Sequence, residues 1–185
     1  MNGEMFGTLP DGTVYTKRRN LWKLPLQNAV TYKGFECQKQ SCGIKQTNYG
    51  SQLNAFALFG AIGKETHITV SFDYILIVRE TGTTNPMCMC YPEGYVGGKW
   101  YGVIDRLGTR YIQPSPDDWT HKKYTFSFNV DKGQAATLNI FPAYLRDIDA
   151  DLYIRNIMIC YGDEDYPYTP APEIDETVVL TEGAG

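Results

Sequence analysis

Apolar and polar residues alternate strictly in two stretches of the chain, residues 67–78 and residues 123–130. In both stretches every even position is apolar, and the odd positions are polar until Ile75 and Ile77 depart from the pattern in the first. Successive side chains of a β-strand point to opposite faces, so a period of two predicts a strand with one buried face. We therefore predict two long strands, and we expect the far end of the first to be covered on both faces.

A third strand is predicted over residues 151–161, which are rich in β-branched and aromatic residues and are followed by Gly162. Leu152 and Ile154 occupy even positions, but after Asn156 the isoleucines stand at odd positions. A one-residue bulge shifts the phase of a strand in this way. Beyond Gly162 the chain is acidic and then rich in proline, so we expect it to leave the sheet in extended form.

The rest of the sequence predicts short strands separated by turns, and we find no helical stretch of useful length. We expect loops or turns at residues 79–98, interrupted by a short apolar run at 87–91, and at 113–118 and 147–150. Short strands with turns at a spacing of roughly 8 to 12 residues are typical of all-β proteins. We therefore predict an all-β, two-sheet antiparallel sandwich, of which the jelly roll is one topology. Further short strands are expected near residues 13–15, 20–32, 43–47, 56–59, 99–104 and 136–141.

Short motifs follow one another in a fixed order along the chain. Arg19-Asn-Leu-Trp22 comes first, followed by Ile68-Thr-Val-Ser-Phe-Asp-Tyr74 and Asp118-Trp-Thr-His-Lys-Lys-Tyr-Thr-Phe-Ser-Phe128. The last strand contains Tyr153-Ile-Arg-Asn156, and Tyr168-Thr-Pro-Ala-Pro-Glu173 comes after it. Together these motifs resemble the jelly-roll domains, similar to carbohydrate-binding modules, of bacteriophage tail, baseplate and fibre proteins. The resemblance covers residues 19–174 and implies a jelly-roll sandwich.

The length of 185 residues suits one domain with extended ends. We divide the chain into an amino-terminal arm (1–18), the jelly-roll domain (19–174) and a carboxy-terminal tail (175–185). The arm has a turn residue every few positions. Two interpretations of it stay open, an arm that lies on a neighbouring subunit and a disordered end.

The charge of the chain is moderate, with a net value of −4 and 21% charged residues. Such a surface has no basic field to attract nucleic acid or anionic lipid, so we expect neither as a partner. No segment approaches the roughly 20 apolar residues needed to cross a bilayer. Residues 1–19 contain no apolar run of signal-peptide length. We therefore expect a protein without membrane insertion that is made and kept in the cytosol or leaves the cell by lysis, as virion parts do. The resemblance implies the virion, assembled in the host cytoplasm.

The chain has five cysteines, and an odd number argues against a disulfide framework. We expect reduced thiols, some of them buried. The alternative is a zinc site, although only the first of two cysteine pairs has the usual spacing. Its four ligands would be Cys37, Cys42, Cys88 and Cys90.

Catalytic motifs are weak, and we do not expect an enzyme. The two histidines, His67 and His121, lie beside or within strands and are not accompanied by a Gly-x-Ser-x-Gly motif. Paired carboxylates that cut glycosidic bonds stand about 5 to 10 Å apart. Asp73 with Glu80 is the better candidate for such a pair, but nothing in the sequence places the two together.

A glycan site needs exposed aromatic rings beside carboxylates or amides, because sugars present apolar C–H faces and hydroxyl edges. The richest such stretch lies between residues 91 and 105, for which ordinary core or interface aromatics are the alternative. A second candidate is the polar face of the two long strands, around Thr69 and Thr125, which includes no aromatic platform. The residues of the first candidate are Tyr91, Tyr95, Trp100 and Tyr101 with Glu93 and Asp105, and Lys99 lies nearby.

The resembled domains often carry a structural calcium near the closing strand, and Asn156 stands where that strand commonly has Asp or Asn. The resemblance therefore implies a calcium ligand at Asn156, although calcium takes six to eight oxygen ligands and the sequence names no others. The alternative is an asparagine that fills the bulge, because Asn tolerates unusual backbone angles. We expect no other cofactor.

The resemblance implies a non-enzymatic bacteriophage virion protein of the tail, baseplate or fibre. Its partners would be other virion proteins and further copies of itself in a homo-oligomer, with host surface glycan as the ligand. One alternative is a purely structural virion part without a ligand. The other is a carbohydrate-binding module that is accessory to a bacterial glycan-degrading enzyme. Fold analogy alone does not separate these functions.

Overall fold

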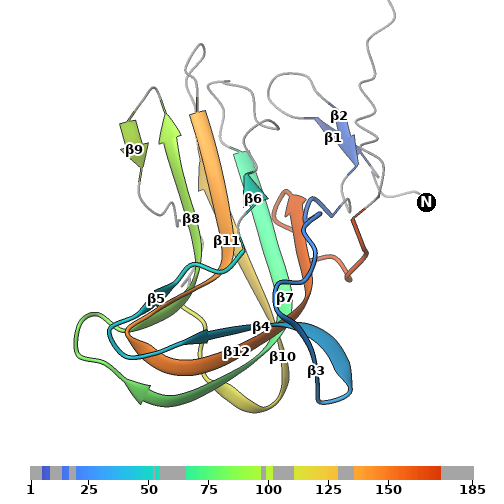
Figure 1. Ribbon diagram of the computed structural model, residues 1–185. Helices are drawn as coiled ribbons and strands as arrows, with labels where there is room; N and C mark the ends of the chain where they lie inside the picture. The colour runs from blue at the N-terminus through green and yellow to red at the C-terminus, as the bar shows by residue number, and fades with distance from the viewer. Residues whose placement is uncertain are drawn as a thin grey trace, which may run out of the picture.

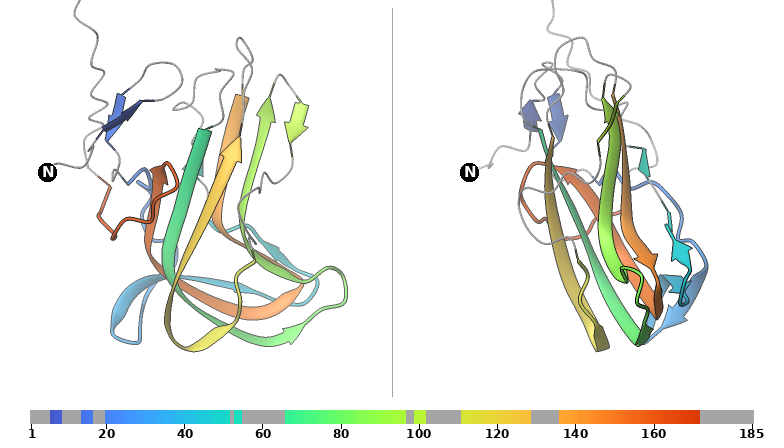
Figure 2. Two further views of the ribbon diagram at one scale, coloured as in Figure 1. Left: turned by 180° about the vertical axis from the view of Figure 1, so that it is seen from behind. Right: turned by 90° about the vertical axis from the view of Figure 1, so that its left-hand side faces the viewer.

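The computed structural model describes residues 6–8, 14–16, 20–51, 53–54, 66–96, 99–101, 111–128 and 136–171. In these residues the chain forms twelve strands and no helix, and the strands make two larger antiparallel sheets and one hairpin (Figure 1). Figure 2 shows the two layers edge on, with β10 and β7 in one layer and β8 and β11 in the other. The predicted all-β, two-sheet sandwich is confirmed.

The first sheet has five strands in the order β10-β7-β12-β4-β3, and every neighbouring pair is antiparallel. Two of the predicted strands, β7 and the closing strand β12, lie at its centre, with β12 between β7 and β4, whereas β10 is an edge strand. The bounds are Ser115–Phe128 for β10, Thr66–Thr81 for β7, Ile148–Tyr161 for β12, Phe35–Cys42 for β4 and Ala29–Tyr32 for β3.

The second sheet is built on β11, which pairs with β8 along most of its length and with two short strands on its other side. A separate hairpin joins β1 to β2. The bounds are Thr47–Asn48 for β5, Leu53–Asn54 for β6, Met87–Val96 for β8, Lys99–Tyr101 for β9, Ala136–Arg146 for β11, Phe6–Thr8 for β1 and Val14–Thr16 for β2.

The core lies between the two sheets and is formed by the apolar positions that the alternation predicted. In β7 the even positions from Ile68 to Leu76 are all buried, and Val78 packs against them partly buried. Tyr124 and Phe126 of β10 are buried in the same cluster, as predicted. Since apolar area removed from water stabilises a fold by about 25 cal/mol per Å², this cluster is the main source of stability.

The predicted bulge in β12 is confirmed. The register with β7 shifts between Arg155 and Met158, and Asn156 has a φ of 54°. On its other side β12 pairs with β4 only as far as Ile154. Beyond the bulge, that free edge is taken by residues 20–22, which are not in a strand.

Asn20 holds this edge with its whole side chain, which is 2% exposed. Its Oδ1 accepts hydrogen bonds from the backbone N–H of Trp22 (2.9 Å) and of Ile159 (3.1 Å). Its Nδ2 donates to the carbonyl oxygens of Ile157 and Thr169, both at 2.9 Å. One asparagine thus ties the opening motif, the closing strand and the Tyr-Thr-Pro motif together, although they are far apart in sequence.

Several predicted boundaries are wrong. The strand expected at 43–47 is a turn that leads into β5, and the real strand in this region is β4, which the sequence analysis missed. Half of the loop expected at 79–98 is β8, whose residues 94–96 pair with β9, and residues 79–81 belong to the end of β7. The turn expected at 113–118 is largely part of β10, which absorbs it in a register shift between Ser115 and Thr120.

Of the remaining expectations, the strand at 20–32 is reduced to β3, and Leu21 and Trp22 are buried without strand structure. The turn at 147–150 is confined to Asp147, and β12 begins at the next residue. The strand expected at 56–59 lies outside the described residues, as does the part of 99–104 beyond Tyr101.

Candidate functional site

The outer face of the first sheet, opposite the core, carries a second apolar cluster. Cys37, Ile75 and Tyr153 are buried there, and the rings of Tyr32 and Tyr153 stack 3.8 Å apart and nearly parallel. This confirms that the far end of β7 is covered on both faces. The cover consists of side chains from neighbouring strands of the same sheet. The partly buried members of the cluster are Val30, Tyr32, Ile77 and Trp119.

The two edges of the first sheet approach each other over this outer face. Lys33, in the turn between β3 and β4, donates hydrogen bonds to the carbonyl oxygens of Pro116 and Asp117 in β10. Phe35 of β4 meets Trp119 of β10 edge to face, with ring centres 6.2 Å apart. The two pairs come from opposite sides of the sheet order, so the outer face is concave between them.

An arginine lies at the bottom of this concavity. The guanidinium carbon of Arg155, in the middle strand β12, is 3.6 Å from the ring centre of Phe35 and 4.8 Å from that of Trp119. A cation over an aromatic face is attracted by the ring quadrupole. Phe35 is nevertheless 47% exposed, so one ring remains open to solvent. We call Phe35, Trp119 and Arg155 the aromatic–arginine site.

Hydrogen-bond donors at this site lack partners. The indole Nε1 of Trp119 and the Nε of Arg155 are buried without a hydrogen bond, and only Gln40 Oε1 shares this condition among the described residues. The nearest recorded carboxylate oxygen, on Asp73, is 3.6 Å from a terminal nitrogen of Arg155. A buried donor without an acceptor costs about 1–3 kcal/mol. Both donor atoms are closed to solvent, so an oxygen-bearing ligand would reach them only after a neighbouring side chain moves.

A polar network borders the site on one side and centres on Asp73. One carboxylate oxygen of Asp73 is 2.8 Å from Nδ1 of His121, and the other accepts a hydrogen bond of 2.8 Å from the amide of Asn156. The Nε2 of His121 lies 2.7 Å from Asp165. Partial burial lowers the pKa of His121, but the hydrogen bonds and charges of the two aspartates outweigh it and raise that pKa above its usual value.

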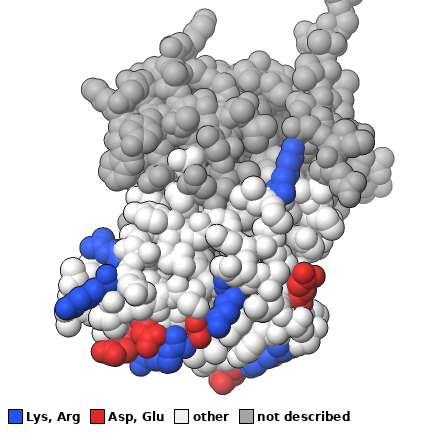
Figure 3. All heavy atoms as spheres, viewed as in Figure 1, with Lys and Arg blue, Asp and Glu red and all other residues white. Residues whose placement is uncertain are grey.

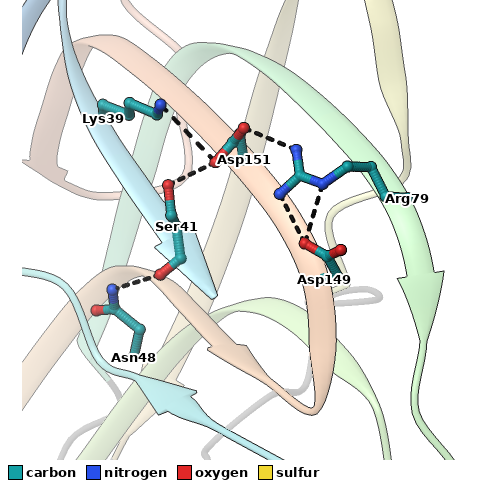
Figure 4. A network of polar contacts seen from close by, with 6 residues as sticks. All are labelled: Lys39, Ser41, Asn48, Arg79, Asp149 and Asp151. Atoms are coloured by element: carbon teal, nitrogen blue, oxygen red, sulfur yellow. Dashed lines mark hydrogen bonds and ion pairs between the residues drawn. The ribbon is translucent and has the colours of Figure 1, made fainter. Parts of the chain in front are cut away.

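The opposite end of the same face carries a different arginine (Figure 4). Arg79 donates from Nε and one terminal nitrogen to Asp149, at 3.0 and 2.6 Å, and from the other terminal nitrogen to Asp151, at 2.8 Å. Burial raises the pKa of Asp151, but hydrogen bonds from Arg79 and Ser41 outweigh it and lower the pKa. The Asn48 amide adds a bond to the Ser41 carbonyl. This network is directed entirely at the chain itself.

The glycan platform predicted at residues 91–105 is only partly described. Tyr91 is half-buried on the second sheet, with its ring centre 5.2 Å from that of Tyr144. Along the backbone, Tyr95 is the register partner of Trp100 and Gly94 that of Tyr101, while Glu93 stands opposite Asn139 of β11. The register thus brings Tyr95 and Trp100 side by side in β8 and β9. Asp105 lies outside the described residues, and this platform stays a prediction.

The second predicted candidate, the polar face of the long strands, requires two corrections. Thr69 and Ser71 are buried, and Thr69 donates a hydrogen bond to the carbonyl of Gly162, so the chain itself covers this part of the face. The aromatic platform that the sequence analysis found missing is present further along the same face, at Phe35 and Trp119. Sequence analysis did not find it because Phe35 and Trp119 come from two strands, one of which, β4, was not predicted.

The metal predictions fall on residues with other contacts. Asn156 occupies the bulge and bonds to Asp73, and a calcium ion there stays a prediction. The five cysteines are free and buried, and Cys37 lies in the outer cluster whereas Cys42, Cys88 and Cys90 lie in the core. The four thiols therefore do not form one zinc site. Within the described ranges, no three His, Cys, Asp or Glu side chains are grouped to hold a metal.

The charged surface gives no sign of a large single-sign patch on the face drawn in Figure 3. Lysines and arginines are interspersed there with aspartates and glutamates over the described part of the chain.

An apolar groove of about 400 Å³ lies between residues 22–26 and residues 168–171, lined among others by Trp22, Leu24 and Tyr168. In the part that the structure describes, no helix has the length and apolar character that a membrane crossing requires.

Comparison with known proteins gives distant similarities only. No protein-family model matches the chain, and no curated protein sequence matches it significantly. Among solved structures it is similar to the CBM22-1 xylan-binding domain of Paenibacillus barcinonensis Xyn10C, with 12% identity and a TM-score of 0.48, covering 74% of this chain and 78% of that one. It is also similar to the tripod of the baseplate of bacteriophage Tuc2009, with 12% identity and a TM-score of 0.40.

The second similarity covers 90% of this chain and 64% of the phage protein. Both matches are of the kinds that the sequence resemblance named, a carbohydrate-binding domain and a phage baseplate protein. At TM-scores below 0.5 they carry no weight in the assignment of the site, which depends on its own geometry.

Proposed function

We propose that this protein is a non-catalytic carbohydrate-binding β-sandwich, and that the aromatic–arginine site holds the sugar. The observation that carries the proposal is the combination at this site of an exposed ring with buried donors that have no partner. A sugar ring stacks its C–H face on an aromatic side chain and supplies oxygen acceptors at its edge. The concave outer face gives both contacts to one ligand.

The polar groups around the site support binding rather than hydrolysis. Asp73 and Glu80, the best carboxylate pair in the sequence, stand seven positions apart on the single strand β7, which corresponds to about 23 Å along a strand. This is well beyond the roughly 5 to 10 Å that glycosidic hydrolysis uses. Asp73 is in turn held by His121 and Asn156, so its oxygens are engaged in positioning other side chains.

We further propose that the protein acts in a bacteriophage virion, as a tail, baseplate or fibre component that assembles with copies of itself and with other virion proteins. The motif resemblance over residues 19–174 supports this, and the distant similarity to a baseplate tripod agrees with it. A stable assembly should bury on the order of 1,000 Å² or more of surface. Light scattering that shows a monomer at high protein concentration would contradict the assembly.

A pull-down on purified bacterial cell-wall polysaccharides and on xylan tests the carbohydrate site. We expect Trp119→Ala to lower retention about tenfold or more, because stacking aromatics dominate such sites. Trp100→Ala is the matched control, since it removes a tryptophan from the other predicted platform. Retention that survives Trp119→Ala but is lost in Trp100→Ala would move the site to β8 and β9. No retention on any polysaccharide would favour a purely structural role.

A further inference from the structure

The segment after β12 turns back over the outer face of the first sheet. Gly162, with a φ of 90°, donates a backbone hydrogen bond to His67 and accepts one of 2.6 Å from the Thr69 hydroxyl. Further along, Thr169 is held by the buried side chain of Asn20. Both ends of the segment are therefore anchored by uncharged hydrogen bonds. We call residues 162–169 the strap.

Side chains beneath the strap are buried although they face away from the core. Met158 and Cys160 of β12 are the register partners of Ser71 and Thr69 in β7, and all four are less than 5% exposed. Burial raises the pKa of the Cys160 thiol to about 12, and the charge of Asp165 adds to this effect. Thr69, the register partner of Cys160, donates its hydroxyl hydrogen bond to Gly162, which places the start of the strap over this pair.

The middle of the strap is fastened by ionisable groups. The sequence has only two histidines, and both contact strap aspartates, His67 through Asp163 and His121 through Asp165. Lys123 of β10 donates to the carbonyl oxygen of Asp163. The other charged groups around His121 are Asp73 of β7, which binds its second ring nitrogen, and Arg155 of β12, which lies beyond Asp73.

The protonation of His121 decides how many of these contacts can form. An imidazolium donates from both ring nitrogens, so it can serve Asp73 and Asp165 together. A neutral imidazole donates from one nitrogen only, and the lone pair of the other then faces a carboxylate. Deprotonation therefore turns one of the two attractive contacts into a repulsive one. The contact to Asp73 is reinforced by a neighbouring strand, whereas Asp165 lies on the strap.

We propose that the strap is a pH-dependent cover, closed while His121 is protonated and lifted in its middle when His121 becomes neutral. Opening would expose Cys160 and Met158 and extend the concave face beside the aromatic–arginine site. The raised pKa of His121 sets the direction. Closure is complete below the ordinary histidine pKa of about 6.5 and is lost as the pH rises through the higher value of the folded protein.

Alkylation of Cys160, followed by peptide mass spectrometry on the full chain, tests the strap without any sugar. The rate is compared between the wild type and His121→Gln at each pH, so that the pH dependence of the reagent cancels. At pH 6 we expect Cys160 to react about fivefold faster in His121→Gln, which is typical of losing one exposed charged contact. By pH 9 the two rates should converge. Equal rates at all pH values, or a constant ratio, would overturn the proposal.

Two further variants separate strap opening from general destabilisation. Asp165→Asn removes the strap side of the contact and should also react faster at pH 6, whereas Glu164→Gln changes an exposed strap carboxylate and should behave as the wild type. Cys88 in the core is the internal control. Faster reaction of Cys88 together with Cys160 would mean that the whole fold opens and would contradict a local strap.

Discussion

Two arginines on the outer face of the first sheet differ in how the chain uses them. Arg79 makes three hydrogen bonds to Asp149 and Asp151, which lie on the neighbouring strand β12. Arg155 makes none among the described residues, and its closest ion pair, to Asp73, measures 3.6 Å. It rests instead on two aromatic rings. Both arginines have carboxylates nearby, so the supply of acceptors does not explain the difference.

The difference lies in what else the carboxylates hold. Asp149 and Asp151 each give one carboxylate oxygen to Arg79, whereas the two oxygens of Asp73 are taken by His121 and Asn156. Donors that the chain satisfies itself stabilise the fold, and donors that it leaves unpaired cost stability unless a ligand takes them. The Arg79 end of the face is therefore structural, and the Arg155 end is suited to binding.

Asn20 is the side chain whose removal should cost the most stability, because all four of its hydrogen bonds are made within the chain. Asn20→Ala leaves two backbone N–H groups and two carbonyls without a partner at the edge of β12. We expect a loss of about 3 kcal/mol in the free energy of unfolding, since each buried unsatisfied group costs about 1–3 kcal/mol and water relieves part of it. Urea denaturation measures this. A loss below about 1 kcal/mol would show that the asparagine is not the tie described here.

Arg155→Met tests the binding end of the comparison. The methionine keeps an unbranched apolar stem against Phe35 and Trp119, so we expect a change in unfolding free energy within about 1 kcal/mol. Retention on the polysaccharide that the wild type binds should fall about tenfold, because a charged donor contributes about 1.5–3 kcal/mol to a hydrogen bond. Arg79→Met is the matched control and should retain binding. Equal retention by the two variants would remove the distinction between the two ends.

Asp151→Asn tests the structural end. We expect the free energy of unfolding to fall by about 1 kcal/mol at pH 7, a modest value because the ion pair between Arg79 and Asp151 is partly exposed. The pKa of Asp151 is lowered in the folded protein, so its contribution is present above the unfolded value of about 3.9 and is lost as the pH falls through the folded value. The stability difference between wild type and variant, followed by thermal unfolding from pH 7 to pH 3, should therefore shrink toward zero. A constant difference would contradict this origin.

The two ends of this face were not equally predictable from sequence. The alternation that predicts β7, β10 and the bulge of β12 is local, so these elements could be found by inspection. Strand β4 could not, because Gln38 and Gln40 are buried polar residues whose side chains bond to the backbone of other elements, at Gln27 in a turn, Asn48 in β5 and Ala143 in β11. A binary pattern of apolar and polar positions cannot anticipate such bonds.

The aromatic–arginine site was harder still. Arg155 and Trp119 both stand in motifs that the sequence analysis quoted, but their meeting depends on the curl of the sheet, which brings β4 and β10 together. That curl is a property of the pairing order and of long-range contacts such as Lys33 with Pro116. The sequence did indicate that Trp119 and His121 lie on the same face of β10, because both stand at odd positions. This was the one feature of the sequence that pointed to the site.

Trp119→Phe makes the smallest and most selective change, because it removes only the indole N–H and part of the ring. That N–H is buried without an acceptor, so its removal should raise the unfolding free energy, whereas the lost ring area should lower it. The net result should lie between no change and a gain of about 0.5 kcal/mol. If a sugar oxygen takes this donor, retention should fall about threefold, between those of the wild type and Trp119→Ala. Urea denaturation and the polysaccharide pull-down measure the two effects. A stability loss above about 1 kcal/mol would mean that the indole N–H already has a partner in the protein, and Trp119 would then belong with Arg79 among the structural groups.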